Sequence, residues 1–271
     1  MIRSQIGQST FQAAYTWSHS IGNQELDNSS GSFNQQAITV QGQPGLDKGS
    51  TNINRPNIFV MNEVYYLPKL ADKNAFVQNT IGGWQVNSIF TAAHGSSLTV
   101  FANGGSYNNG AVSGLIGTGY NGNNRPLTVS GTTCNSGEKG SQILNANYFT
   151  LVGYTLGTAP STMAKRGSCF GAPTTNLDGQ LAKNWQIKER YRVKFAMDFF
   201  DLFNHPNFNS SGLEGTGYAP STLTCGSAAC GPTNPSRLVT AQSTVSGFGS
   251  VSSLQTSRGN RELQYSLKFT F

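Results

Sequence analysis

Alternation of apolar and polar residues at the end of the chain constrains its fold more than any other feature. From Leu263 to Phe271, each odd position holds Leu, Tyr or Phe, and each even position holds Gln, Ser, Lys or Thr. A period of two places the two kinds of side chain on opposite faces of a β-strand. The segment therefore predicts a strand with one apolar face and one polar face.

Five earlier segments also predict strands. They cover residues 11–17, 57–67, 84–100, 181–187 and 193–203, and the second and third alternate less cleanly than the others. The charged residues 188–190 predict a tight turn, and hence a hairpin, between the last two segments. With the final segment they give about six antiparallel strands, each near the ~9 to 11 residues that a tilted transmembrane strand requires.

The composition fits a membrane crossed by strands. Charged residues make up 11% of the chain, whereas an ordinary soluble domain has roughly 25%. The chain also holds 16 Phe and 10 Tyr, an unusual content for a soluble surface. Mean hydropathy is −0.32, and nowhere do about 18 apolar residues follow one another, so a membrane-spanning helix is not expected. If the chain crosses a membrane, strands must do so.

The connections between these segments alternate in length. Counted back from the C-terminus, they are long (204–259), short (188–191), long (101–178), medium (68–83) and long (19–56). An up-and-down outer-membrane barrel has short periplasmic turns and long extracellular loops. The long connections are rich in Gly, Asn, Ser and Thr, as in residues 103–124, and we expect exposed, mobile loops.

Together these patterns predict an all-β fold, the C-terminal part of a large transmembrane outer-membrane β-barrel. In such a barrel the apolar side faces lipid and the polar side faces the lumen. The residues predicted to face lipid are Val193, Phe195, Met197, Phe199, Leu263, Tyr265, Leu267, Phe269 and Phe271. Lys194, Asp198 and Lys268 are predicted to face the lumen. The alternative is aromatic packing inside a soluble β-sandwich.

Aromatic residues at strand ends suit the two membrane interfaces, where such residues form girdles. The candidates are Trp17, Tyr66, Trp84, Phe203 and Phe271. The net charge of +6 comes from scattered Lys and Arg without a dense run, so no nucleic-acid partner is expected.

Five segments resemble the C-terminal barrel of TonB-dependent receptors, especially the Oar-like group. They are AAYTWSHSIGN (13–23), RPNIFVMNEVYYLP (55–68), GGWQVNSIF (82–90), FAMDFFDLFNHPNF (195–208) and RELQYSLKFTF (261–271). The resemblance implies a barrel of about 22 strands with an N-terminal plug inside it and a TonB-contacting segment ahead of the plug. About six strands cannot close such a barrel, so residues 1–271 are expected to be a partial barrel that lacks the plug. Residues 1–11 also lack the features of a secretory signal.

The resemblance implies a function in the outer membrane, the uptake of a nutrient with energy passed on by TonB. The implied partners are outer-membrane lipid, the remainder of the barrel, the plug, the TonB system and the barrel assembly machinery, which would recognise the C-terminal strand. Two alternatives remain open. One is a secreted or surface β-sandwich adhesin, and the other is an outer-membrane hydrolase.

The four cysteines, Cys134, Cys169, Cys225 and Cys230, fall in the two longest connections, which suits an oxidising compartment. Three pairings are possible. We favour Cys134 with Cys169 and Cys225 with Cys230, because each pair lies within one connection. The spacing of Cys225 and Cys230 and the lack of nearby His argue against zinc, so no metal or cofactor is expected.

The three histidines, His19, His94 and His205, lie at or near the ends of predicted strands. Some outer-membrane barrels are hydrolases that use a Ser–His pair, but the sequence alone cannot show which serine, if any, lies beside these histidines in the fold. We therefore expect that the protein is not an enzyme, and that His205 helps to form the turn that leaves its strand.

Overall fold

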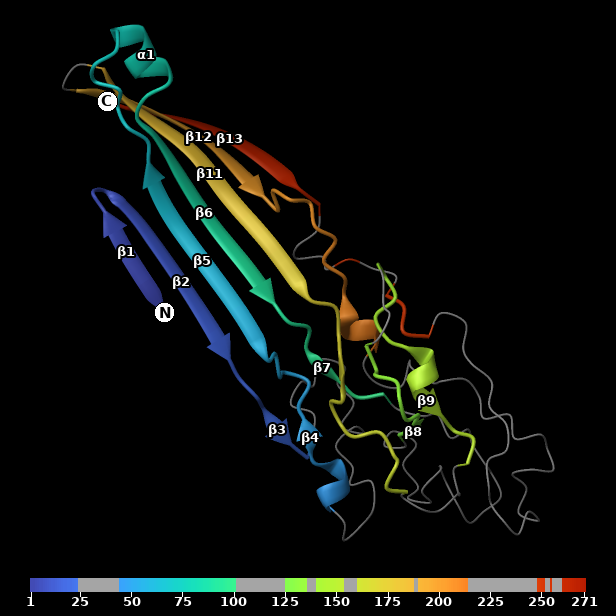
Figure 1. Cartoon of the computed structure of the whole chain (residues 1–271). Coiled ribbons are helices and arrows are strands. Elements are labelled where there is room, and N and C mark those ends of the chain that lie inside the picture. Colours follow the sequence, from blue (N-terminus) through green and yellow to red (C-terminus); the bar gives the residue numbers. More distant parts are fainter. Residues whose placement is uncertain are drawn as a thin grey trace.

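The computed structural model describes residues 1–23, 44–100, 125–135, 140–153, 160–187, 190–213, 248–251, 254 and 260–271. Its main element is a seven-stranded sheet (Figure 1). The strands are β1 (Ile2–Ile6), β2 (Ser9–Trp17), β5 (Asn57–Tyr66), β6 (Trp84–Ala93), β11 (Thr174–Ile187), β12 (Tyr191–Phe200) and β13 (Glu262–Thr270). Each strand pairs antiparallel with the next in this order. The fold is all-β, as predicted.

The sheet is a simple meander that stays open. Among the described strands, β1 and β13 stand at the two edges, and each pairs with one neighbour. The helices in the described part of the chain are too short or too polar to cross a membrane.

Six of the seven strands correspond to the predicted segments, and β1 is an addition. Its residues, IRSQI, hold only two apolar positions, so the alternation signal is weak. Gly7 adopts a φ of +61° in the two-residue turn to β2. Tight hairpin turns need this left-handed conformation, and Gly adopts it without steric cost.

Two predicted strands end early because the backbone turns away. β6 stops at Ala93 rather than at residue 100, and at Gly95 an added Cβ would lie 1.9 Å from the carbonyl oxygen of Gly171. The close approach of two backbones there redirects the chain. β12 stops at Phe200 because Asp201 has a φ of +48°, and the Asp201 N–H donates to the carboxylate of Asp178 at 3.0 Å.

The two ends of the sheet differ, as the loop lengths predict (Figure 1). One end carries the β1–β2 turn, the C-terminus and the helix α1 (Ala75–Thr80). We call it the short-turn end. The opposite, long-loop end carries small pairs and short 3-10 helices, namely β3 (Ile21–Gly22) with β4 (Gly49–Ser50), β7 (Ser97–Leu98) with β10 (Cys169–Phe170), β8 (Leu127–Thr128) with β9 (Phe149–Thr150), η2 (Pro44–Asp47), η3 (Ala146–Tyr148) and η4 (Ser210–Leu213).

The buried hydrophobic cluster lies in the long connections and not on the main strands. Its members are Leu98, Val100, Cys134, Ile143, Leu144, Phe149, Ala164, Cys169, Ala172, Leu213, Phe248 and Val251. We call the described connections around this cluster the loop cap. The expectation of exposed loops is therefore wrong for these parts, because scattered apolar residues from separate connections meet in one cluster. Residues 103–124 lie outside the described residues.

Candidate membrane-facing surface

The apolar side chains of the last two strands share one face of the sheet. Eight of the nine residues predicted to face lipid stand opposite one another in register pairs, Val193 with Phe269, Phe195 with Leu267, Met197 with Tyr265 and Phe199 with Leu263. Directly opposed residues in an antiparallel pair project from the same face. The ninth, Phe271, follows the end of β13 and is 88% exposed.

This apolar face continues across the sheet in rows. One row runs from β13 to β5 through Tyr265, Met197, Leu181, Val86 and Tyr65. A second row runs from β11 to β2 through Leu177, Phe90, Met61 and Ala13. The apolar face of the last two strands thus extends across the sheet as far as β2.

The apolar face is not the inside of a sealed core. On β13, Leu263, Tyr265, Leu267 and Phe269 are 51, 62, 64 and 63% exposed. A soluble β-sandwich would bury such residues against a second sheet. Contiguous exposed apolar surface of this kind marks a surface that meets another apolar phase or a partner.

The opposite face carries polar and charged residues that hydrogen-bond across strands. Gln180 donates to the carboxylate of Asp198 at 2.6 Å and accepts from Asn87 at 2.9 Å, and Asn87 accepts from Gln85 at 2.8 Å. The chain of bonds connects β12, β11 and β6. Lys194 stands opposite Lys268 on this face, as predicted for the polar parity. Some large apolar residues also lie on the polar face, namely Ile58, Val60 and Val64 of β5, Ile89 of β6 and Phe200 of β12.

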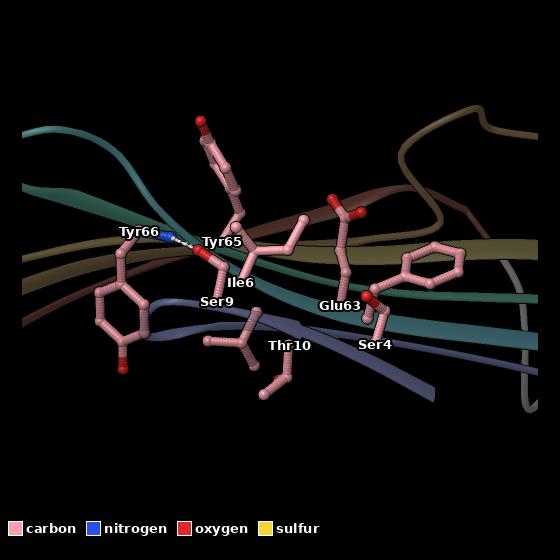
Figure 2. Close-up of a pocket in the computed structure, with 9 residues that line it drawn as sticks. Ser4, Ile6, Ser9, Thr10, Glu63, Tyr65 and Tyr66 are labelled. Carbon is pink, nitrogen blue, oxygen red and sulfur yellow. Dashed lines mark hydrogen bonds between the residues drawn. The ribbon is translucent and has the colours of Figure 1, made fainter. Parts of the chain in front are cut away.

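Among the described strand residues, Glu63 is the one carboxylate on the apolar face, and it lies beside the edge of the sheet. It lines an open hollow of about 310 Å³ with Ser4, Ile6, Phe11 and other residues of β1, β2 and β5. Figure 2 shows Glu63 and Tyr65 pointing to one side of the strands, and Tyr66 and Thr10 to the other. The Tyr66 N–H donates to the Ser9 hydroxyl at 3.0 Å, which fixes the start of β2 against the end of β5.

At the short-turn end, α1 is fastened to the apolar face by three donors. The indole N–H of Trp84 donates to the carbonyl of Thr80, and that of Trp185 to the carbonyl of Asn79, both at 2.8 Å. The Lys183 ammonium donates to the carbonyl of Gly82 and, at 3.4 Å, to that of Gln78. We call this arrangement the α1 clamp.

Lys183 is the residue in the clamp that sequence reasoning missed. The register places it between Trp84 and Phe195, so a cation stands on the apolar face. Its ammonium lies 5.4 Å from the Trp84 ring centre and 5.6 Å from that of Trp185. Cation–π contacts and carbonyl acceptors replace the water that the cation gives up, and Lys183 is only 3% exposed. The sequence does contain one signal for it: Lys183 is a single Lys at a position of β11 where the alternation predicts an apolar residue.

The structure distributes the predicted girdle residues unevenly. Trp84 lies on the apolar face at the short-turn end, and Trp17, 71% exposed, stands opposite Asn57 at the long-loop end. Tyr66 is on the polar face, because its neighbour Tyr65 occupies the apolar row. Phe203 and Phe271 lie outside the strands and are 65 and 88% exposed.

The loop cap contains the disulfide between Cys134 and Cys169, with 5.4 Å between the Cα atoms. This is the first of the two pairings favoured from sequence. Both sulfurs belong to the buried cluster, where Cys134 is 4% and Cys169 0% exposed. Cys225 and Cys230 lie outside the described residues.

Buried ion pairs stabilise a second part of the loop cap. The Arg125 guanidinium donates to the Asp47 carboxylate at 3.0 Å and to the carbonyls of Leu46 and Ala164 at 2.6 and 2.8 Å. Arg166 donates to the same carboxylate oxygen at 3.4 Å. Asp47, Arg125 and Arg166 are 2, 0 and 3% exposed. The ion pairs join the β2–β5 and β6–β11 connections.

The three histidines have different surroundings. His19 Nε2 lies 2.9 Å from the Ser50 hydroxyl, so the structure does place a serine beside one of them. In the described part of the chain, no carboxylate is hydrogen-bonded to that ring. The His94 ring packs edge-on against Phe170 at 4.6 Å. The backbone N–H of His205 donates to the Asp201 carboxylate at 3.3 Å, within the turn that leaves β12.

The chain was compared with known protein families, curated proteins and solved structures. A family described as an outer membrane beta barrel domain matches residues 3–264. No curated protein and no solved structure matches the chain.

Proposed function

The chain belongs to the outer membrane beta barrel domain family, and on this premise we propose that it is the C-terminal part of a TonB-dependent transport barrel of the Oar-like type. Its location is the outer membrane. The observation that carries the proposal is the meander with one apolar face and with its long connections gathered at one end. The TonB-dependent type is supported by the five sequence segments and by their order along the chain.

The apolar face is the lipid-facing surface in this proposal. Lipid-facing and lumen-facing residues alternate along every strand of such a barrel. The two rows give the strands from β13 to β2 apolar side chains on this one face. The hydrogen-bonded chain from Asp198 to Gln85 then faces the watery lumen, where its polar atoms remain hydrated.

Glu63 fits this orientation because of its position along the strand. It lies three residues before the end of β5, on the way to the short-turn end. The cost of a charge on the lipid face falls to about 0 to 1 kcal/mol near the interfaces. Tyr65 and Tyr66, which follow it, suit the same interfacial level.

The open edges support a partial barrel. Unpaired backbone groups at a sheet edge cost several kcal/mol each in hydrocarbon, and β1 and β13 each leave one edge unpaired among the described strands. We propose that further strands of the same receptor complete the barrel at both edges and that a plug fills the lumen. The proposed partners also include the TonB system and the barrel assembly machinery, which would recognise β13. The proposal includes no enzymatic step, cofactor, metal or nucleic acid.

The hydrolase alternative deserves one control because of the pair of His19 and Ser50. Serine hydrolases orient the histidine with a third group, usually a carboxylate. The described residues offer no such group to His19. We expect no esterase turnover by the refolded chain, and turnover that disappears in Ser50→Ala would favour the alternative.

The test of the transport proposal starts with the DNA upstream of Met1. We expect an in-frame coding region for a plug domain and a signal peptide. The full-length product should bind the periplasmic domain of TonB, and binding should be lost when the segment ahead of the plug is deleted. A complete upstream gene for an unrelated soluble protein, with its own stop codon, would contradict the proposal.

A further inference from the structure

The β5–β6 connection lies past the ends of β5 and β6 (Figure 1) and is held against the apolar face at the end of β11. Its three anchoring donors, Trp84, Lys183 and Trp185, all project from that face. They bind carbonyls of residues 78–82 at the C-terminal end of α1. That end carries partial negative charge, which favours the Lys183 cation. The connection therefore belongs to the outer wall of the sheet.

Several polar groups of the connection are hydrogen-bonded within it. The Asn74 side chain caps α1 by accepting from the Val77 N–H at 2.9 Å. Gln78 donates to the carbonyls of Ala71 and Lys73 at 3.0 and 2.6 Å. The Thr80 hydroxyl donates to the carbonyl of Phe76 at 2.7 Å. These hydrogen-bonded groups lose little when they move from water to a less polar medium.

The outer side of the connection presents large apolar residues. Phe76 is 75% and Ile81 61% exposed, and none of the helix residues is buried. Lys69 and Lys73 are exposed in the same connection, and the Lys73 ammonium lies 3.8 Å from the exposed carboxylate of Asp72. Apolar side chains flanked by Lys, next to a pair of Trp residues, are typical of a segment at the level of lipid headgroups. The surface is also continuous with the apolar face through Trp84, whose ring meets that of Phe195 at 6.2 Å.

We propose that residues 69–85, held by the α1 clamp, form a membrane-interface anchor that inserts Phe76 and Ile81 among the phospholipids of the leaflet at the short-turn end. The clamp fixes the depth of the anchor relative to the strands, and Lys69 and Lys73 reach the phosphate groups. The anchor rests on the proposed orientation of the apolar face toward lipid. Its partner is a phospholipid surface, and not the plug or the lumen.

The experiment uses the full chain refolded into vesicles of phosphatidylethanolamine and phosphatidylglycerol. An environment-sensitive dye is attached to single cysteines introduced as Phe76→Cys, Ile81→Cys, Leu267→Cys and Gln186→Cys, in a background in which the four native cysteines are oxidised or replaced. Lipids with a nitroxide near the headgroup or deep in the acyl chain quench the dye according to its depth. Leu267 tests the apolar face, and Gln186 is the control on the polar face.

We expect strong quenching at positions 76 and 81 by the shallow nitroxide, quenching at 267 by the deep nitroxide, and little at 186. Quenching at 267 without quenching at 76 and 81 would overturn the anchor and leave the proposed orientation intact. Absence of quenching at 267 would overturn the orientation and the anchor together.

A second pair of variants tests the clamp itself. Trp185→Phe removes the indole donor to Asn79 and keeps an aromatic ring, whereas Trp17→Phe makes the same change at the long-loop end. We expect Trp185→Phe to weaken shallow quenching at position 76, and Trp17→Phe to leave it unchanged. Equal quenching in both variants would show that the clamp does not set the depth of the connection.

Discussion

The sheet and the loop cap of this protein use their apolar residues in opposite ways. On β13 the apolar side chains are more than half exposed, whereas Leu98 and Leu144 of the cap are 0% exposed. The cap resembles a small soluble domain with its own core, disulfide and buried ion pairs. The sheet has no such core and needs an external apolar phase to cover it. One chain thus contains two parts adapted to two solvents.

The largest expected effect that separates the two parts is the loss of the buried carboxylate. Asp47→Asn leaves Arg125 and Arg166 without the negative charge that both contact. Breaking a buried pair in this way costs about 3 to 5 kcal/mol. We expect the cap to become sensitive to proteases while the sheet keeps its far-UV circular dichroism. Joint unfolding of both parts at one denaturant concentration would contradict their independence.

Removing the disulfide should destabilise the cap by a similar or slightly smaller amount. Cys134 and Cys169 close a loop with a sequence separation of 35, and such a cross-link contributes about 2 to 5 kcal/mol. The measurement is the denaturation midpoint of the cap for Cys134→Ser with Cys169→Ser, compared with the oxidised protein. A midpoint that does not change on reduction of the native protein would argue against this pairing.

A matched pair of leucine truncations compares the two environments directly. Leu144→Ala should cost about 2 to 5 kcal/mol, because it removes transfer free energy and leaves a cavity. In a bilayer, Leu267→Ala should cost less, because mobile lipid chains fill the space and no cavity remains. The free energy of unfolding from vesicles gives both values. Equal costs would indicate that Leu267 is enclosed by protein.

Arginine scanning tests the two faces of the sheet. Phe195→Arg should cost about 2 to 4 kcal/mol if the residue faces lipid near mid-membrane. Lys194→Arg keeps its charge and its side chain on the polar face, and we expect almost no change. Similar effects of Arg at the two neighbouring positions would refute the assignment of faces.

The smallest expected effect is at the α1 clamp. Trp185→Phe removes a hydrogen bond to the carbonyl of Asn79, and such a bond contributes about 0.5 to 1.5 kcal/mol. The effect should appear in the free energy of unfolding in vesicles. A loss above that range would mean that the clamp also holds the register of β11 against β6.

The sequence predicts the sheet better than the cap because the two parts have different signals. Alternation is local, so Leu263 to Phe269 reveal their face without any knowledge of their neighbours. The cap depends on contacts between distant segments, such as Asp47 with Arg125, which are 78 positions apart. No local sequence pattern predicts such a contact. The loop cluster was therefore missed, while the all-β meander was predicted.

On the apolar face, too, the positions of some single residues depend on contacts with distant segments and could not be predicted from local sequence patterns. Tyr65 and Tyr66 are adjacent aromatics, and only the register with β6 decides which of them lies on the apolar face. Lys183 breaks the apolar parity of β11, and its acceptor at Gly82 is 101 positions away. β1 has too few apolar residues to alternate visibly. Composition and periodicity do not determine the strand register. The register decides which face such residues occupy and which residues they contact.

The loop cap also determines what an external binding agent would recognise. Its core takes residues from the β6–β11 and β12–β13 connections, and Asp47 adds the β2–β5 connection. An antibody against the cap thus meets a discontinuous epitope, one that vanishes on denaturation. Immunisation with a linear peptide from a single connection would yield sera that react on blots and ignore intact cells.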